Sequence, residues 1–99
     1  MIYEMRTYTL KPGSVDTVEK LFAESLPHRL KYSKLTAFWH TEIGPLNQII
    51  HLWEYNDLNH RTEVRAKSMK DPNWPPKIAE YIVEMESKIL IPAAFSPIK

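Results

Sequence analysis

Residues 35–55 read LTAFWHTEIGPLNQIIHLWEY, and this stretch decides the fold. Its two halves, residues 35–43 and 48–55, are rich in aromatic and aliphatic side chains, a composition that favours β-strands. The four residues between them, Gly44-Pro45-Leu46-Asn47, are typical of a turn. The stretch therefore predicts an antiparallel hairpin.

The segments on either side of the hairpin complete one simple topology. Residues 2–10 lack Gly and Pro and predict a strand, whereas Lys88 to Ile91 predict a short strand that Pro92 places at a sheet edge or bulge. Apolar residues at helical spacing predict three helices. Ser14 caps the first, which is interrupted near Pro27. Asp57 caps the second, which runs to about Lys70, and Pro76 opens the third, which runs to about Ser87.

This order, βαββαβ, predicts an α+β, ferredoxin-like sandwich: an antiparallel four-stranded sheet with helices on one face. A meander with its helices packed at one end is the main alternative. The chain has 99 residues, which is enough for one domain over residues 1–99. It has no Cys and only two Gly, which excludes disulfides, thiolate chemistry and glycine-rich phosphate loops.

Charge and hydropathy exclude further classes. A formal net charge of +1, with basic residues scattered among acidic ones, argues against nucleic-acid binding. No apolar run is long enough to span a membrane and no leader pattern precedes residue 2, so we expect a cytoplasmic protein.

The period of two sorts the strand residues onto two faces. With a four-residue turn, His40 lies opposite His51 and Phe38 opposite Trp53. The other face of the hairpin is mostly aliphatic, and we expect it to lie under the helices. We assign to the open face a mixed aromatic and ionisable set, which is also the predicted ligand-binding set: Glu4, Arg6, Tyr8, Phe38, His40, His51, Trp53 and Tyr55.

Four aromatic side chains of this set, left in water, expose on the order of 600–1,000 Å². Because soluble monomers rarely show apolar patches of that size, we expect a second copy to cover them. The prediction is a homodimer through the open sheet face, with a small-molecule pocket between the two sheets.

Several side chains of this face could carry chemistry. His40 and His51 could transfer a proton or, with Glu42, hold a metal; we expect no metal and no cofactor, since metal sites usually need three or four convergent ligands. Arg6 could hold a substrate carboxylate, and Glu4 could either orient it or serve as a base. His40, His51 and Arg6 are thus the catalytic candidates, although each also has a structural interpretation.

Features outside the strands are open to two interpretations. Arg61 and Arg65 form either a basic rim or a solvated helix face. Trp74 is either a lid or a loop anchor.

The segment YEMRTYTLKPG at residues 3–13 resembles the opening of NIPSNAP-family domains. Residues 39–55, Arg61, Asp71-Pro72 with Trp74, and Phe95-Ser96-Pro97 resemble that family as well. The resemblance implies a dimeric α/β-barrel protein, a ferredoxin-like protomer that dimerises through its open sheet face. It implies no catalytic residue.

Three functions remain open from the sequence. The first is a homodimeric small-molecule-binding protein of unassigned activity. The second is a cofactor-independent oxygenase or isomerase that acts on a small aromatic or carboxylated substrate. The third is a structural or interaction module without a ligand.

Overall fold

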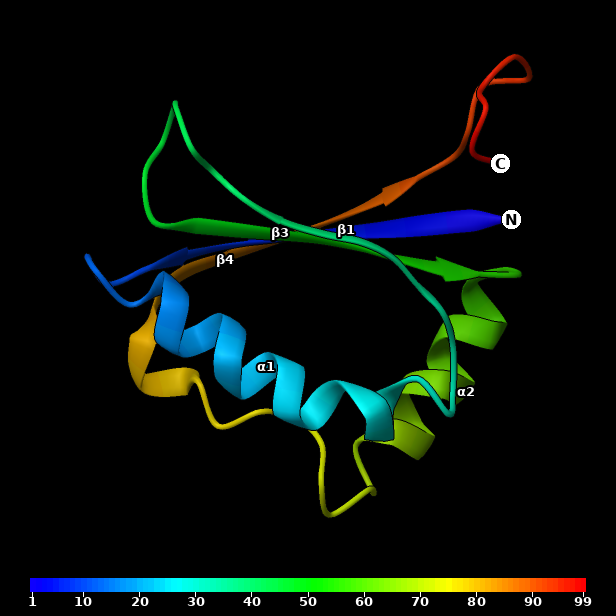
Figure 1. Ribbon diagram of the computed structural model, residues 1–99. Coiled ribbons are helices and arrows are strands. Elements are labelled where there is room, and N and C mark those ends of the chain that lie inside the picture. The colour runs from blue at the N-terminus through cyan, green and yellow to red at the C-terminus, as the bar shows by residue number, and fades with distance from the viewer.

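A computed structural model describes residues 1–99 as one sheet with helices packed against one of its faces (Figure 1). The elements in chain order are β1 (Ile2–Leu10), α1 (Val15–Arg29), β2 (Leu35–His40), β3 (Gln48–Tyr55), α2 (Leu58–Ser68), the 3-10 helix η1 (Ala79–Tyr81) and β4 (Ile82–Leu90). The strands lie in the order β2-β3-β1-β4, and every neighbouring pair is antiparallel. This arrangement confirms the ferredoxin-like α+β fold.

Both helices begin after the residues predicted to cap them, but only one of these residues forms the cap. The Asp57 carboxylate accepts a hydrogen bond of 2.8 Å from the backbone N–H of His60, which caps α2. Ser14 precedes α1, but its hydroxyl donates to the Lys11 carbonyl instead of capping the helix. Pro27 does not end α1, which continues to Arg29. None of the helices is both long and apolar enough to cross a bilayer.

The prediction for residues 76–87 is wrong. Instead of a third long helix, the chain forms the single turn η1 and then the nine-residue strand β4. Its apolar residues fit a helix only loosely, and the free edge of β1 decides the outcome by pairing with this segment from Tyr3–Leu90 to Leu10–Ile82. The strand predicted at Lys88–Ile91 is the end of β4, which lies at a sheet edge as predicted but is not short. Its register shift lies opposite Thr9 and Leu10, at the end remote from Pro92.

The predicted hairpin register is also wrong, by two residues. Phe38 pairs with His51, and His40 pairs with Ile49. The cause is that β2 ends at His40, so that the connection to β3 is longer than the four-residue turn expected. A shift of two residues leaves each side chain on its own face.

The predicted grouping of side chains is largely right, but the assignment of the two faces is inverted. Tyr8, Trp53 and Tyr55 lie under the helices, where they belong to the hydrophobic core with Phe22 of α1 and Val64 of α2. The open face instead carries most of the set expected in the core, including Trp39, which is 54% exposed. Leu35 is the exception: it lies before the register shift in β2 and packs against the core. The aromatic side chains are therefore covered within one protomer, so the predicted reason for a dimer does not hold.

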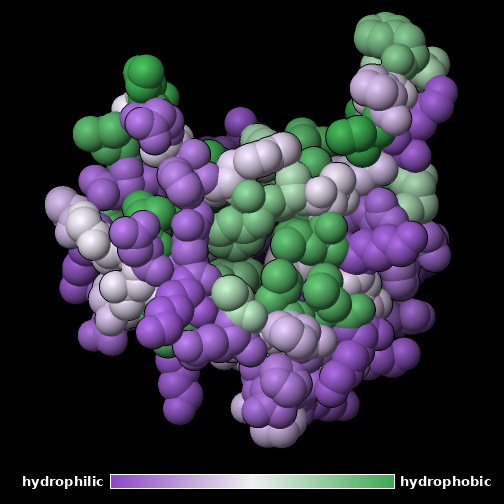
Figure 2. Space-filling view, viewed as in Figure 1, coloured by the Kyte–Doolittle hydropathy of each residue, from purple (hydrophilic) through white to green (hydrophobic).

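Two segments project from the sheet on the side away from the helices (Figure 1). They are the connection at residues 41–47 and the C-terminal segment at residues 91–99, and both bear hydrophobic side chains at their surfaces (Figure 2). Ile43 is 92% exposed and Phe95 is 91% exposed. The open sheet face is thus flanked by apolar side chains in contact with water.

Candidate functional site

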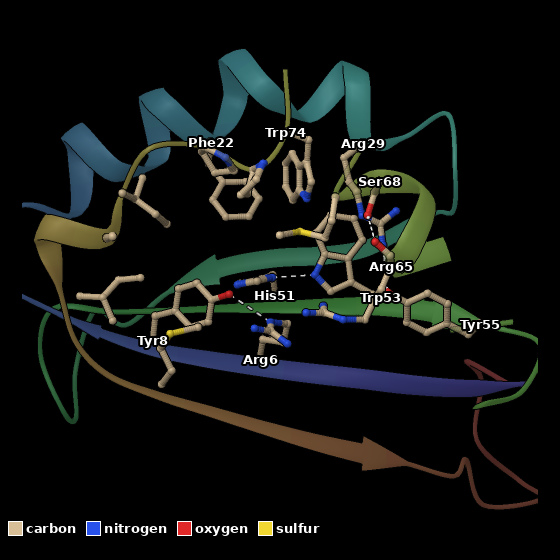
Figure 3. Close-up of a pocket in the computed structure, with 17 residues that line it drawn as sticks. Arg6, Tyr8, Phe22, Arg29, His51, Trp53, Tyr55, Arg65, Ser68 and Trp74 are labelled. Atoms are coloured by element: carbon tan, nitrogen blue, oxygen red, sulfur yellow. Dashed lines mark hydrogen bonds between the residues drawn. The ribbon is translucent and has the colours of Figure 1, made fainter. Parts of the chain in front are cut away.

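A cavity of about 320 Å³ lies between the sheet and the helical layer (Figure 3). β1 and β3 supply its floor, α1 and α2 supply walls, and Trp74 from the loop after α2 lies over it. The lining is mainly apolar and aromatic, with a few polar groups: Arg6, Tyr8, Phe22, Arg29, His51, Trp53, Tyr55, Arg65, Ser68, Met69, Trp74, Pro75, Pro76, Ile78, Ala79, Ile82 and Met85. The volume is at the lower end of the range for small-molecule sites.

His51 is the buried polar group at the centre of this floor. Its Nδ1 accepts a 2.7 Å hydrogen bond from Trp53 Nε1, so the ring proton resides on Nε2. Burial and the nearby charge of Arg6 lower the pKa of His51 to about 3, which keeps the ring neutral. His51 is 1% exposed, yet its Nε2 has no hydrogen-bond partner. A buried donor beside a cavity is thus available to an acceptor on a ligand.

Tyr8 and Arg6 lie beside His51 and also present donors. The Tyr8 and His51 rings meet edge to face with centroids 4.8 Å apart, and Arg6 is the cross-strand partner of His51. Arg6 Nε donates to the Tyr8 hydroxyl oxygen at 3.0 Å, which leaves the Tyr8 proton free to donate elsewhere. The donor cluster, Arg6, Tyr8 and His51, is therefore suited to oxygen acceptors.

Glu4 organises the charges behind this cluster. Its carboxylate accepts hydrogen bonds from Arg6 at 3.0 Å, from two nitrogens of Arg61 at 2.9 Å each, and from Ser87 at 2.5 Å. Burial raises the pKa of Glu4, but these hydrogen bonds and the two guanidinium charges outweigh burial and hold it at about 2. Glu4 is completely buried and does not line the cavity, so it positions Arg6 rather than meeting a ligand.

Arg29 belongs to the last turn of α1. It enters the cavity at the end opposite the donor cluster. Its guanidinium stacks on Trp53 at 4.5 Å and donates 2.9 Å hydrogen bonds to the hydroxyls of Tyr55 and Ser33. Burial lowers the pKa of Arg29 despite the opposing effect of Tyr55. Trp53 thus lies between the donor cluster at one end and a buried cation at the other (Figure 3).

The structure brings together five of the eight predicted ligand-binding residues as cavity lining: Arg6, Tyr8, His51, Trp53 and Tyr55. Phe38 lies behind His51, on which it stacks with centroids 5.2 Å apart, and does not reach the cavity. His40 is on the exposed edge of β2, where its Nδ1 lies 2.8 Å from a Glu19 oxygen. The predicted pairing of His40 with His51 is therefore wrong, and no group of three or more His, Asp or Glu side chains converges as a metal site.

Sequence reasoning missed Arg29, and it left Trp74 and Arg61 open. Arg29 could have been found, because it continues the apolar stripe of α1 seven residues after Phe22. Trp74 both anchors its loop, edge to face with Phe22 at 5.4 Å, and lines the cavity. Arg61 is partly exposed, but its guanidinium binds the buried Glu4 carboxylate and does not line the cavity. Arg61 and Glu4 are 57 residues apart in the sequence, so no local pattern indicates that they are partners.

Together, the fold and the cavity define a ferredoxin-like α+β domain with an internal aromatic pocket. The NIPSNAP family model matches residues 3–97. A NipSnap homolog of Dictyostelium discoideum is 35% identical over 94 residues, which are 92% of this chain and 42% of that protein. The crystal structure of a NIPSNAP family protein with unknown function from Agrobacterium tumefaciens is 39% identical, with a TM-score of 0.94 over 100% of this chain and 94% of that one.

The chain therefore belongs to the NIPSNAP family. It spans less than half the length of the Dictyostelium relative. A more distant structure, a putative antibiotic biosynthesis monooxygenase from Nitrosomonas europaea, shares the fold with a TM-score of 0.72 at 8% identity, over 93% of this chain and 98% of that one. At that identity the likeness concerns the fold alone.

Proposed function

We propose that this protein binds a small organic molecule in the cavity between its sheet and helices. The observation that carries the proposal is the Nε2–H of His51, a buried donor without a partner on the wall of an aromatic cavity of about 320 Å³. Such a donor is costly unless an acceptor occupies the space beside it. Aromatic walls with a few convergent polar groups are the usual composition of a small-molecule site.

The test is to fill the cavity from its rim. Ala79 lines the cavity and is exposed at the same time, so Ala79→Trp can place an indole in the opening without disturbing the core. Ala66→Trp, on the exposed side of α2, is the matched control. Neutral aromatic probes such as indole and benzyl alcohol, titrated by calorimetry, are expected to bind the parent and A66W and to lose binding in A79W. Equal binding by A79W, or no binding by the parent, would contradict the proposal.

A second candidate is a cofactor-independent oxygenase or isomerase, supported by the donor cluster. Neutral His51, Tyr8 and Arg6 could stabilise an oxyanion that develops on a bound substrate. His51 would act as a donor in this role, because Trp53 occupies its only lone pair. A base from the solvent would take the α-proton of a bound carbonyl compound, the resulting enolate oxygen would accept hydrogen bonds from this cluster, and D₂O would return a deuteron to the carbon. NMR follows this exchange, and His51→Phe would abolish it. Binding without any such turnover would favour the first candidate.

We also propose that the protein is a homodimer through the open sheet face. This proposal does not depend on the aromatic side chains that the helices cover. That face carries Trp39, and the apolar segments at residues 41–47 and 91–99 project beyond it on the same side (Figures 1 and 2). Two copies related by a two-fold axis could each place these segments against the sheet of the other. Exposed apolar residues on such segments are costly in an isolated protomer.

Light scattering after size exclusion at micromolar concentration tests the dimer. We expect the parent to have twice the protomer mass and the Phe95→Asp variant to shift toward the protomer. Leu58→Asp is the matched control, because Leu58 is 57% exposed and belongs to α2, which lies on the side of the sheet opposite the open face. A stable monomer for the parent would refute the dimer, and an unchanged mass for F95D would remove the C-terminal segment from the interface.

A further inference from the structure

The end of the cavity beside the last turns of α1 and α2 contains a buried positive charge without a counterion. Arg29 is 3% exposed, but its only hydrogen-bond partners are the neutral hydroxyls of Ser33 and Tyr55. It takes part in none of the ion pairs of the protein. Buried charges in proteins are normally paired, because desolvation of an isolated charge is expensive.

A second cation lies at the same end. Arg65 of α2 lines the cavity near Arg29, Ser68 and Tyr55 (Figure 3). Its side chain also forms no ion pair, although its backbone carbonyl accepts a hydrogen bond from Ser68. The charge of Arg65 contributes to lowering the pKa of Arg29, which indicates that the two guanidinium groups influence each other.

No acidic residue of the chain is in contact with either of these two charges, although the Glu4 charge raises the pKa of Arg29 from a distance. Three arginines line the cavity, Arg6, Arg29 and Arg65, whereas no Asp or Glu does so. The nearest carboxylate, Glu4, is already engaged by Arg6, Arg61 and Ser87. The lining thus has an excess of positive charge, and this excess is concentrated at the Arg29 end.

Donor groups remain available at that end. A guanidinium has five N–H groups, and Arg29 uses two of them in its bonds to Ser33 and Tyr55. Arg65 uses none in a hydrogen bond to a protein group. The planar arrangement of guanidinium donors matches the two oxygens of a carboxylate. Between this end and His51, Trp53 and Trp74 provide aromatic surfaces for an apolar body.

We infer that the ligand is an apolar or aromatic carboxylic acid whose carboxylate lies between Arg29 and Arg65 and whose body packs against Trp53 and Trp74. The inference rests on the proposed function, because it specifies what the cavity binds. It also accounts for a feature that core packing leaves unexplained, the presence of an unpaired arginine in the interior.

Paired probes that differ in charge alone test this assignment. Phenylacetate and phenylacetamide have nearly the same shape, and only the first is an anion; phenyl phosphate tests a different anionic group. Calorimetry on the full chain is expected to give an affinity for phenylacetate at least tenfold above that for phenylacetamide. Phenyl phosphate, whose head group is larger and more strongly hydrated, is expected to bind more weakly than phenylacetate.

Variants locate the charge. Arg65→Gln removes the less buried guanidinium and is expected to weaken phenylacetate binding about tenfold while it leaves phenylacetamide binding unchanged. Lys67→Gln, an exposed change of the same charge on the same helix, is the matched control and is expected to leave both affinities unchanged. Arg29→Lys retains the charge in the core, and it is expected to weaken phenylacetate binding because the forked donors are lost. Thermal unfolding of each variant checks that the domain is folded.

The outcomes separate the two proposals. If acid and amide bind equally, or if R65Q loses both in parallel, the cavity is a binding site but the carboxylate assignment is overturned. A clear preference for phenyl phosphate would overturn it as well. If none of the probes binds, and indole and benzyl alcohol do not bind either, the proposed function itself fails.

Discussion

Glu4 allows a quantitative prediction, because one buried carboxylate binds two arginines on different elements. The perturbation is the substitution Glu4→Gln, which keeps the size of the side chain and removes its charge. The pKa of Glu4 falls from its ordinary value of 4.5 to about 2 in the folded protein, mainly through hydrogen bonds from Arg61 and Ser87 that overcome the effect of burial. Each tenfold change in ionisation corresponds to about 1.4 kcal/mol, so the ionised form of Glu4 stabilises the fold by about 3 kcal/mol.

The sign follows from the lowered pKa. The stabilisation is fully present above pH 4.5, where Glu4 is ionised in both the folded and unfolded states. It is lost as the pH falls from 4.5 to about 2, because the unfolded chain takes up a proton that the folded chain resists. Glu4→Gln should therefore unfold about 3 kcal/mol more easily at pH 7, and this difference from the parent should vanish near pH 2.

The assay is urea denaturation of the parent and of E4Q at pH 7, 4.5, 3 and 2, at one protein concentration so that any self-association is held constant. Glu86→Gln is the matched control: Glu86 is exposed on β4 and forms only a surface pair with Lys88. It is expected to change the free energy of unfolding by less than about 0.5 kcal/mol at every pH. The reasoning would be refuted by an E4Q difference that is equally small, or that stays constant from pH 7 to pH 2.

Three further predictions concern other parts of the fold. The imidazole of His51, observed by ¹⁵N NMR, should take up no second proton between pH 8 and 5, because burial and, to a lesser extent, Arg6 lower its pKa to about 3. Uptake of that proton near pH 6.5 would contradict the buried ring that is hydrogen-bonded to Trp53. Because the unfolded chain takes up this proton first, the contribution of His51 to stability is lost as the pH falls from 6.5 toward 3. Phe22→Ala should lower the free energy of unfolding by roughly 3–5 kcal/mol in urea titrations, because Phe22 packs between α1 and the sheet, whereas Leu58→Ala on the exposed side should change it little. Asp57→Ala should cost about 1 kcal/mol by the same measurement, and no loss would mean that its bond to His60 does not cap α2.

Local sequence patterns predict much of this fold. Alternation along residues 2–10 and 48–55 places Glu4, Arg6 and Tyr8 on the same face as His51 and Trp53, and the structure agrees. The turn residues after residue 43 predict the hairpin, although its register differs by two because β2 ends early. Residues 82–90 show the limit of periodicity, since a weak helical pattern yields to the pairing that β1 offers.

The candidate site is less visible in the sequence. Five of its lining residues are predicted because strand alternation groups them. Arg29 and Trp74 come from a helix and a loop, and their approach to Trp53 depends on how α1 and the segment after α2 cross the sheet. The partners of Glu4 are likewise separated from it by up to 83 residues in the chain. Contacts over such distances leave no periodic signal.

For β1 and β3, the sequence by itself determined which strand side chains share a face, because alternation is a property of each strand alone. Only the tertiary structure decided which face the helices cover, and so whether Trp53 and Tyr55 meet water or a pocket. Packing made that choice, because the large aromatic side chains bury more surface under α1 and α2 than the smaller set opposite, and Arg61 reaches Glu4 only from that side. The unpaired charge of Arg29 beside the cavity is a consequence of the same choice.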